Sequence, residues 1–294
     1  MYRIAIINQK GGVAKTTTSV NLAAGLALLE FELNPESPER VLYVQLDKQA
    51  DGTAILNHTM YKGEGEDRRL ADETLLTIAN ILIDEEPPST RKVIQKAQMP
   101  ASLAKIDRNN LDFIPTDPPT MAQVDEFINM VDMREQRLDF GLQEVDPLYK
   151  YCVIDTPPGH KVLIKNALTA ATHVIIPVVA SGAGLRSLND SLATVRSVQR
   201  RLNPDLKVLG ILPSRCDLTR SEAKIVLEEL ERHYTNLLFE PIAERADVSA
   251  AYSLGYDIFS YLPPKSGSSS FISKKDAAIE FGKLVQEVYR RLHY

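Results

Sequence analysis

The stretch QKGGVAKTTT near the amino terminus contains the residue types that bind phosphate groups. Two adjacent glycines permit a turn whose backbone N–H groups converge on an anion. The ammonium of Lys15 can reach the terminal phosphates of a nucleotide, the hydroxyl of Thr16 can ligate Mg²⁺, and Thr17 can hydrogen-bond the inner phosphates. The predicted phosphate-binding residues are Gly11, Gly12, Val13, Ala14, Lys15, Thr16 and Thr17.

This stretch departs from the common phosphate-loop pattern G-x-x-x-x-G-K-[ST], which requires glycine at positions 9 and 14 when Lys15 and Thr16 end it. The chain has Gln9 and Ala14 there, and it carries a second lysine, Lys10. We expect Ala14 to enter the following helix with a negative φ, so that the added methyl group does not prevent binding. The common pattern assigns no role to Lys10.

The elements around the stretch fit a phosphate site. Residues 3–8 predict a strand and residues 15–30 a helix, and a helix N-terminus after a glycine turn attracts anions. A second strand, YCVID, ends in Asp155. A carboxylate delivered by a buried strand to the sheet edge usually holds Mg²⁺ through a water molecule. We therefore predict Thr16 and Asp155 as the metal-binding residues.

Short β-branched runs alternate with helical segments along the rest of the chain. This rhythm predicts an α/β fold with one doubly wound, mainly parallel sheet and helices on both faces. Polar or proline-rich stretches at 32–40, 60–69 and 263–270 are interpreted as surface loops, so residues 1–294 are expected to form a single domain. The further helices are predicted at 121–138, 185–201, 221–233 and 276–292.

The composition restricts the class of protein. The chain has 294 residues, 44% hydrophobic content and a net charge of −5, which is typical of a globular protein and allows only a local patch for nucleic acid. Cys152 and Cys216 lie in predicted buried strands and have no disulfide or metal-site spacing, which favours a reducing cytoplasm. No apolar run approaches the ~20 residues that cross a bilayer.

Three motifs resemble one family of nucleotide hydrolases. KGGVAKTT at 10–17 resembles K-G-G-x-G-K-T-[ST], the deviant Walker A loop of the ParA/MinD ATPases. VLYVQLDKQ resembles their strand that carries D-x-D-P-Q, and DTPP at 155–158 resembles D-[TC]-P-P. The segments NALTAATHVIIPV and NPDL are closest to ParA/Soj-type partition ATPases, which have the P-loop NTPase fold.

The resemblance implies a role for each catalytic candidate. The family's signature lysine, here Lys10, reaches across an ATP-dependent dimer to the partner's phosphates, as an arginine finger does. Lys15 stabilises phosphate charge in its own subunit, and Asp47 orients the attacking water. Gln45 and Lys48 replace the family's first acidic residue and its proline. We therefore expect ATP and Mg²⁺ as cofactors and a slow intrinsic rate of ATP hydrolysis.

The same resemblance implies contacts with adenine and with DNA. The strand end ILPSRCD occupies the place of the base pocket, so Pro213, Ser214 and Arg215 are candidates. Arg220 and Arg245 align with family positions that bind nucleoid DNA without sequence preference, and phosphate contacts of that kind weaken as salt rises. The expected partners are a second copy of the chain, DNA, and a ParB-like or cargo-adaptor activator.

Three alternatives use the same fold. A MinD-like membrane ATPase requires a terminal amphipathic helix, but Glu280 and Glu287 lie on the last predicted helix, which favours packing on the domain. A reductase with an iron–sulfur cluster requires paired cysteines at a subunit interface, whereas Cys152 lies inside a strand. A positioning ATPase for a protein cargo shares every motif above, so this alternative remains open.

Overall fold

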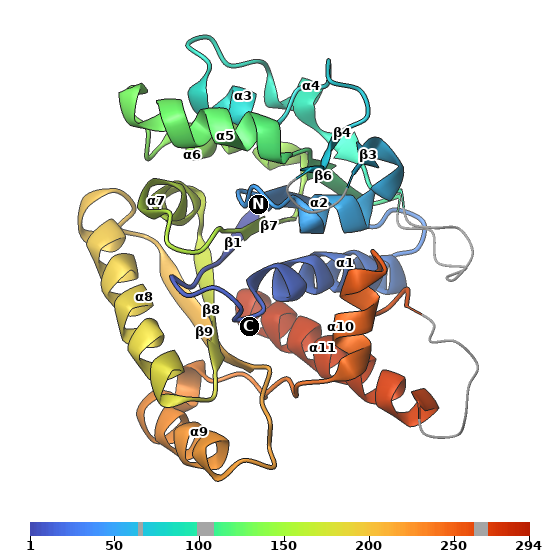
Figure 1. Cartoon of the computed structure of the whole chain (residues 1–294), viewed down its shortest axis with the longest axis vertical. Helices are drawn as coiled ribbons and strands as arrows, with labels where there is room; N and C mark the ends of the chain where they lie inside the picture. The colour runs from blue at the N-terminus through green and yellow to red at the C-terminus, as the bar shows by residue number, and fades with distance from the viewer. Residues whose placement is uncertain (64–66, 99–108, 262–269) are drawn as a thin grey trace.

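The computed structural model describes residues 1–63, 67–98, 109–261 and 270–294, without the side chains of residues 270–275. Strands and helices alternate along most of this chain (Figure 1). The strands are β1 Tyr2–Ile6, β2 Val41–Gln45, β3 Tyr61–Lys62, β4 Arg69–Leu70, β5 Gln95–Lys96, β6 Leu111–Ile114, β7 Tyr151–Asp155, β8 His173–Val179 and β9 Lys207–Ser214. The helices are α1 Lys15–Leu33, α2 Asp51–Leu56, α3 Ile78–Ile83, α4 Thr90–Val93, α5 Pro118–Phe127, α6 Arg137–Val145, α7 Lys161–Ala170, α8 Gly182–Arg201, α9 Ser221–Tyr234, α10 Ala246–Ser253 and α11 Ser270–His293.

In the described residues the main sheet has seven strands in the order β5-β6-β2-β7-β1-β8-β9. Its neighbours pair in parallel except at the β5 edge, where β5 runs antiparallel to β6. The order reverses direction around β1, so the segments that follow β1, β2 and β7 meet at one edge of the sheet. The predicted doubly wound, mainly parallel fold is confirmed.

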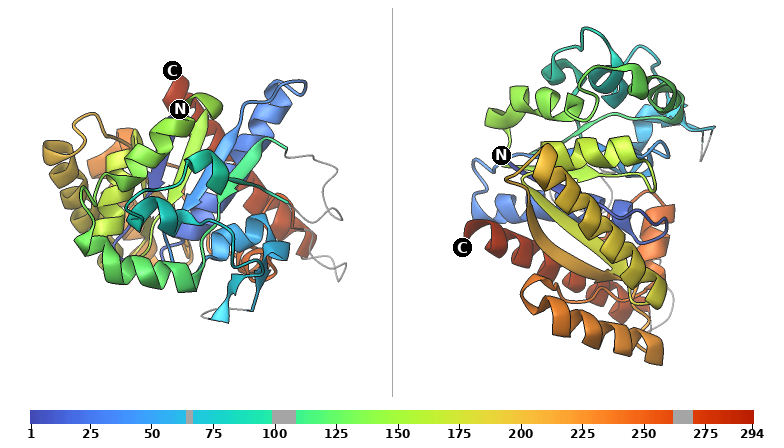
Figure 2. Two further views of the ribbon diagram at one scale, coloured as in Figure 1. Left: turned by 90° about the horizontal axis from the view of Figure 1, so that it is seen from above. Right: turned by 90° about the vertical axis from the view of Figure 1, so that its left-hand side faces the viewer.

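The central strands are buried on both faces because their alternate side chains enter two hydrophobic cores. In β1, Ile4 and Ile6 enter the core that contains α1, α10 and α11, whereas Ala5 enters the core that contains α3 and α5 to α9. In β7, Tyr151 and Val153 face the first core and Cys152 the second. The two groups of helices lie on opposite sides of the sheet (Figure 2).

The predicted helix over 121–138 is wrong in its extent. Helix α5 begins after Asp117, whose side chain accepts a hydrogen bond from the N–H of Thr120, and α6 starts only at Arg137. Between the two helices Met133 adopts a left-handed φ of 52°. Asn166 of α7 donates to the carbonyl of Arg134 in this break and accepts from the N–H of Leu138. Tertiary hydrogen bonds of this kind are not visible in helical periodicity.

The predicted loop over 60–69 contains a two-stranded ribbon. Tyr61 pairs with Leu70 and Lys62 with Arg69 in antiparallel register. The remaining predicted helices are found with longer ends, which is expected because helix boundaries are the least certain part of a sequence interpretation. The predicted loop at 263–270 lies almost wholly outside the described residues.

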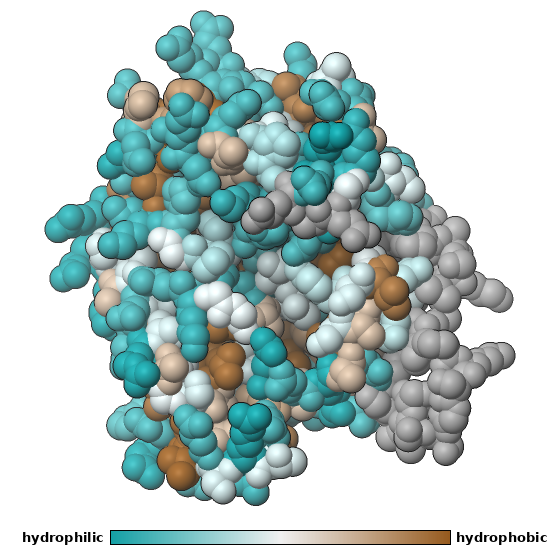
Figure 3. Space-filling view, viewed as in Figure 1, coloured by the Kyte–Doolittle hydropathy of each residue, from teal (hydrophilic) through white to brown (hydrophobic). Residues whose placement is uncertain are grey.

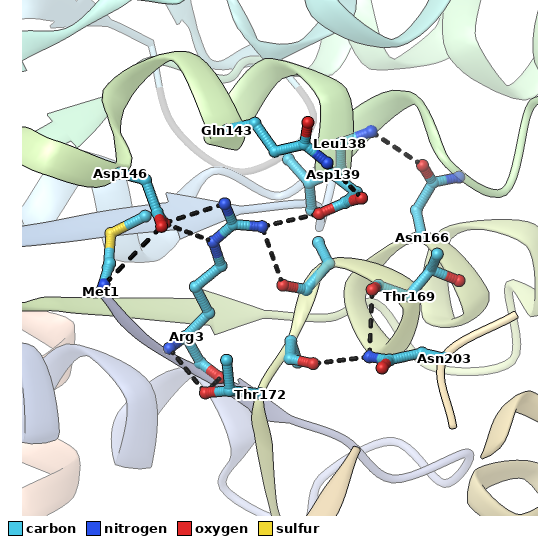
Figure 4. A network of polar contacts seen from close by, with 12 residues as sticks. Met1, Arg3, Leu138, Asp139, Gln143, Asp146, Asn166, Thr169, Thr172 and Asn203 are labelled. Carbon is cyan, nitrogen blue, oxygen red and sulfur yellow. Dashed lines mark hydrogen bonds and ion pairs between the residues drawn. The ribbon is translucent and has the colours of Figure 1, made fainter. Parts of the chain in front are cut away.

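A buried arginine fixes α6 to the amino end of the sheet (Figure 4). The guanidinium of Arg3 on β1 donates to Asp139 at 2.7 Å, to Asp146 at 3.0 Å and to the carbonyl of Ala170 at 3.2 Å. A buried charge with this many partners is satisfied, because two carboxylates and a carbonyl compensate it. The network lies at the start of β1, and the glycine turn follows the other end of that strand.

The surface offers no membrane-spanning element in the described residues, because none of their helices combines sufficient length with sufficient apolar content. The face seen in Figure 3 is mainly hydrophilic, with hydrophobic residues in separate spots.

Candidate nucleotide site

The turn between β1 and α1 is a left-handed nest at the helix N-terminus. Gly12 has a φ of 71° and Ala14 a φ of 62°. The expectation of a negative φ at Ala14 is therefore wrong. A left-handed alanine costs roughly 1–2 kcal/mol, and the family's glycine would avoid this cost. The alanine permits the same turn because its methyl group is small.

Lys15 is almost fully buried below this turn. Its ammonium donates to the carbonyl of Lys10 at 3.0 Å. Burial lowers the pKa of Lys15, and the nearby Asp155 and Asp47 carboxylates oppose that shift. The Lys15 ammonium thus has one hydrogen bond, to a backbone oxygen, and no carboxylate in direct contact among the described residues. It can therefore bind phosphate oxygens, whose negative charge would stabilise it.

The side chain of Lys10, unlike that of Lys15, is exposed to solvent. Its backbone N–H donates to the Asn8 side chain at 2.9 Å, so the main chain is held in place. Its side chain is exposed, and it makes no ion pair or hydrogen bond with the residues that the structure describes. The two lysines of one loop therefore have opposite environments.

Asp155, the last residue of β7, is fully buried beside the turn. Its Oδ2 accepts from Gln45 Nε2 at 3.3 Å and from the Tyr43 hydroxyl at 3.4 Å. Burial raises the pKa of Asp155 to about 7, while the hydroxyls of Thr16 and Ser19 act in the opposite direction. The other oxygen, Oδ1, has no hydrogen-bond partner among the described residues.

The Oδ1 atom of Asp155 is buried and has no partner among the described residues, so it is available to a metal ion. Mg²⁺ prefers oxygen ligands and usually retains waters and substrate phosphates, so one carboxylate and one hydroxyl are sufficient protein partners. Asp155 and Thr16 meet that requirement. The described residues contain no cluster of three or more His, Cys, Asp or Glu side chains that would form an all-protein metal site. The donor set therefore fits a nucleotide-bound magnesium ion.

The hydrogen bonds of Gln45 explain why an amide suits the position where the family has an acidic residue. Its Nε2 donates to Asp155 and its Oε1 accepts from the N–H of Thr53 at 3.1 Å. A carboxylate at this position would lie against Asp155 and repel it. The neutral amide instead connects the Asp155 carboxylate to α2.

Asp47 lies two residues after β2 and lines the same pocket. Its Oδ1 accepts from the N–H of Gln49 at 3.1 Å. Burial raises the pKa of Asp47, and the Gln49 N–H and the Lys15 ammonium partly oppose the shift. The sheet topology thus brings Lys15, Asp47 and Asp155 together, as the sequence predicted.

The pocket has a volume of about 400 Å³ and extends well beyond these residues. We call its two parts the phosphate end and the distal end. The phosphate end is formed by Gly11, Gly12, Lys15, Thr16, Thr17 and Asp47. The distal end is formed by Arg215, Ile242, Glu244, Val248, Tyr252 and Phe281. A pocket of this size that starts at a glycine turn fits a nucleotide.

The three adenine candidates, Pro213, Ser214 and Arg215, lie in different places relative to the pocket. Pro213 is buried in β9 and does not line the pocket, and its carbonyl accepts from the N–H of Ile242. Ser214 lines the pocket and donates to the carbonyl of Val13 at 3.0 Å. Arg215 has a left-handed φ of 49° and spans the pocket wall, donating to the carbonyl of Gly12 at 3.0 Å and to Glu244 at 2.6 Å.

Most of the distal end was missed by sequence reasoning. Ile242 precedes α10, Val248 and Tyr252 belong to α10, and Phe281 belongs to α11. These residues come from the last fifth of the chain, and no phosphate-type motif marks them. The sequence predicted a helix that packs on the domain over 276–292, and it predicted no helix over α10.

The two DNA candidates have different environments. Arg220 precedes α9, its side chain is 74% exposed, and it pairs with Asp217 at 2.8 Å. Arg245 lines the nucleotide pocket, is 24% exposed and pairs with Glu280 at 2.6 Å. Of these two arginines, only Arg220 has a side chain that is largely exposed to solvent.

Comparisons with known proteins agree with this geometry. A family model described as an AAA domain matches residues 1–208. The sporulation initiation inhibitor protein Soj of Bacillus subtilis (strain 168) is 33% identical over 270 residues, which cover 92% of this chain and 94% of Soj.

Two solved structures have the same fold. McdA of Cyanothece has a TM-score of 0.75 at 20% identity, and the match covers 99% of both chains. Cobyrinic acid a,c-diamide synthase of Mycobacterium smegmatis, with bound ADP and magnesium, has a TM-score of 0.70 at 26% identity over 99% of this chain and 95% of the synthase.

Proposed function

Because the chain belongs to the ParA/MinD family of deviant Walker A ATPases, we propose that it pairs around ATP, binds nucleoid DNA and segregates plasmid or chromosome DNA. In this proposal hydrolysis ends the cycle by separating the dimer, and a ParB-like partner protein stimulates it. A protein cargo remains the alternative to a DNA cargo, since both classes of positioning ATPase require the same pocket.

The chemistry assigned to the pocket follows from its groups. Lys15 and the N–H groups of the turn bind the phosphates and compensate their charge. Thr16 and Asp155 hold Mg²⁺, which neutralises phosphate charge when it is bound. Asp47 accepts a hydrogen bond from the attacking water and aligns it with the terminal phosphate.

The ammonium of Lys10, which is exposed and has no ion pair or hydrogen bond within the described part of the chain, is the observation that carries the dimer proposal. Its main chain is held by Asn8, and its carbonyl already binds Lys15 of the same subunit. The side chain is therefore free to act outside its own pocket, and a second subunit's triphosphate would supply the charge that it lacks.

Light scattering tests the pairing. An Asp47→Ala variant should bind ATP without hydrolysing it, and its mass should double at saturating Mg·ATP. Adding Lys10→Ala should return it to a monomer that still binds nucleotide, whereas Lys207→Ala, a surface lysine at the start of β9, should leave the dimer intact. A monomer in every nucleotide state would refute the proposal.

DNA binding is proposed to depend on Arg220, with Arg245 as a second candidate whose pairing with Glu280 predicts a smaller contribution. Gel shifts with unrelated duplexes at low salt should require ATP and weaken in Arg220→Ala. Arg69→Ala, which removes an exposed arginine on β4, is the matched control. Equal binding with and without ATP would contradict this step.

A further inference from the structure

The segment that carries Asp47 is a tight turn between β2 and α2. The N–H of Ala50 donates to the carbonyl of Asp47 at 3.2 Å, and Ala50 has a left-handed φ of 56°. Helix α2 then begins at Asp51, and no side chain caps its N-terminus. The position of a catalytic carboxylate matters, because a misplacement of about 1 Å can lower the rate about 10²-fold.

Asp51 connects this turn to two other parts of the molecule. One carboxylate oxygen pairs with the guanidinium of Arg68, which also donates to the carbonyl of Gln49 at 2.8 Å. The other oxygen accepts from the Tyr252 hydroxyl at 2.7 Å. Arg68 directly precedes β4 of the small ribbon, and Tyr252 belongs to α10 in the pocket wall.

These contacts are partly shielded from water. The side chains of Arg68 and Asp51 are 16% and 31% exposed. Burial and the Asp51 carboxylate raise the pKa of Tyr252 far above its ordinary value, so the hydroxyl remains a donor at any physiological pH. Hydrogen bonds to a charged group in such a setting are stronger than neutral surface contacts.

A competing attachment of the same turn is weaker. Lys48 lies 3.9 Å from Asp125 of α5, and these side chains are 58% and 41% exposed. Exposed pairs at this separation contribute little. The ribbon and α10 therefore hold the turn through the Asp51 carboxylate, with the Gln49 carbonyl as a second contact of Arg68.

We propose that Asp51 is a positioning residue that holds Asp47 at the terminal phosphate by fastening the turn to the ribbon through Arg68 and to the nucleotide pocket through Tyr252. This inference rests on the proposed role of Asp47. It assigns a function to the ribbon, which the phosphate-site motifs leave without one.

The main test is steady-state ATP hydrolysis by Asp51→Ala. Because a displaced catalytic group lowers turnover more than substrate binding, we expect kcat to fall about tenfold while KM for ATP changes less than about twofold. Asp51→Asn, which retains an acceptor for Tyr252, should recover part of that loss. Asp72→Ala is the matched control, since Asp72 is an exposed aspartate whose side chain bonds, among the residues that the structure describes, only to Thr74.

Two further variants separate positioning from folding. Arg68→Gln and Tyr252→Phe should each lower kcat about threefold, and Tyr252→Phe should add almost nothing in the Asp51→Ala background, because residues that act as one unit are not additive. Multiplicative effects, a wild-type kcat in Asp51→Ala, or a loss confined to KM would each overturn the inference. If Asp51→Ala does not fold, the single and paired Arg68 and Tyr252 variants decide the question.

An Asp47→Ala arm distinguishes this inference from the proposed function. If Asp47→Ala hydrolyses ATP normally, the proposed role of Asp47 fails. If Asp47→Ala is inactive and Asp51→Ala has a wild-type kcat, only the positioning role fails.

Discussion

The phosphate end and the distal end of the pocket are built in different ways. The six phosphate-end residues come from the turn after β1, the start of α1 and the segment after β2, and they offer backbone N–H groups, hydroxyls and charged side chains. The distal end comes from the strand end of β9, the segment before α10, α10 itself and α11, and much of it is apolar. Sequence motifs mark the phosphate end, whereas the distal end forms only when α10 and α11 pack against the rest of the fold.

This difference predicts different energetic roles. In the proposed function, charged groups at the phosphate end would act on charge that changes during the reaction, so their loss should lower turnover. Apolar groups at the distal end would contact a bound nucleotide equally before and during the reaction, so their loss should weaken binding alone. The experiments below compare the two ends.

The largest effect is expected for Lys15→Ala. Removal of a buried ammonium that compensates phosphate charge should lower kcat/KM for ATP by about 10²- to 10³-fold. Lys207→Ala, with an exposed lysine far along the chain, should have wild-type kinetics. If Lys15→Ala lowered kcat/KM by less than about fivefold, the proposed difference in energetic role between the phosphate end and the distal end would be contradicted.

The second effect concerns stability at the phosphate end. Burial raises the pKa of Asp155 to about 7 from an ordinary 3.8. A carboxyl with a raised folded pKa contributes stability that is fully present below its unfolded pKa and is lost as the pH rises through about 7. Without nucleotide, Asp155→Asn should therefore stabilise the protein by roughly 2 kcal/mol at pH 8 and by almost nothing at pH 4.

Urea denaturation at the two pH values measures this difference. The same variant should lose Mg²⁺-dependent nucleotide binding, which calorimetry can follow. A variant that is less stable than the wild type at pH 8 would show that the carboxylate is better solvated than its burial indicates.

The third effect concerns the distal end. Phe281 lines the pocket and is 2% exposed. Phe281→Leu should raise KM for ATP about fivefold with kcat nearly unchanged, because uniform binding is lost. Phe113→Leu, a fully buried phenylalanine of the same core that does not line the pocket, should lower stability by a similar amount and leave KM unchanged.

The smallest effect is expected for Ala14→Gly. Glycine removes the strain of the left-handed φ but loses more backbone entropy on folding, so a net stabilisation of about 0.5–1 kcal/mol is expected in thermal melts. Ala50→Gly should behave in the same way, since Ala50 has a φ of 56°. Ala27→Gly, inside α1, should instead destabilise the protein by about 1 kcal/mol.

Much of the phosphate end was predictable from sequence because its residues are close in the chain or follow buried parallel strands that are neighbours in the sheet. The parallel topology followed from alternating strand and helix patterns, and such strands must deliver Asp47 and Asp155 to one edge. The conformation of Ala14 was not predictable, because a single positive φ leaves no mark on residue type when the residue is alanine. The break before α6 depends on Asn166, which lies far along the chain.

The sequence by itself determined the fold class, the family and the groups that would meet a triphosphate, because hydrophobic periodicity and motif spacing are local properties of the chain. Tertiary structure alone decided that Lys10 is exposed while Lys15 is buried, that Arg245 is paired with Glu280, and that Asp51 joins the ribbon to α10. Each of those facts depends on contacts between residues remote in sequence, and residue order does not encode such contacts in any local pattern.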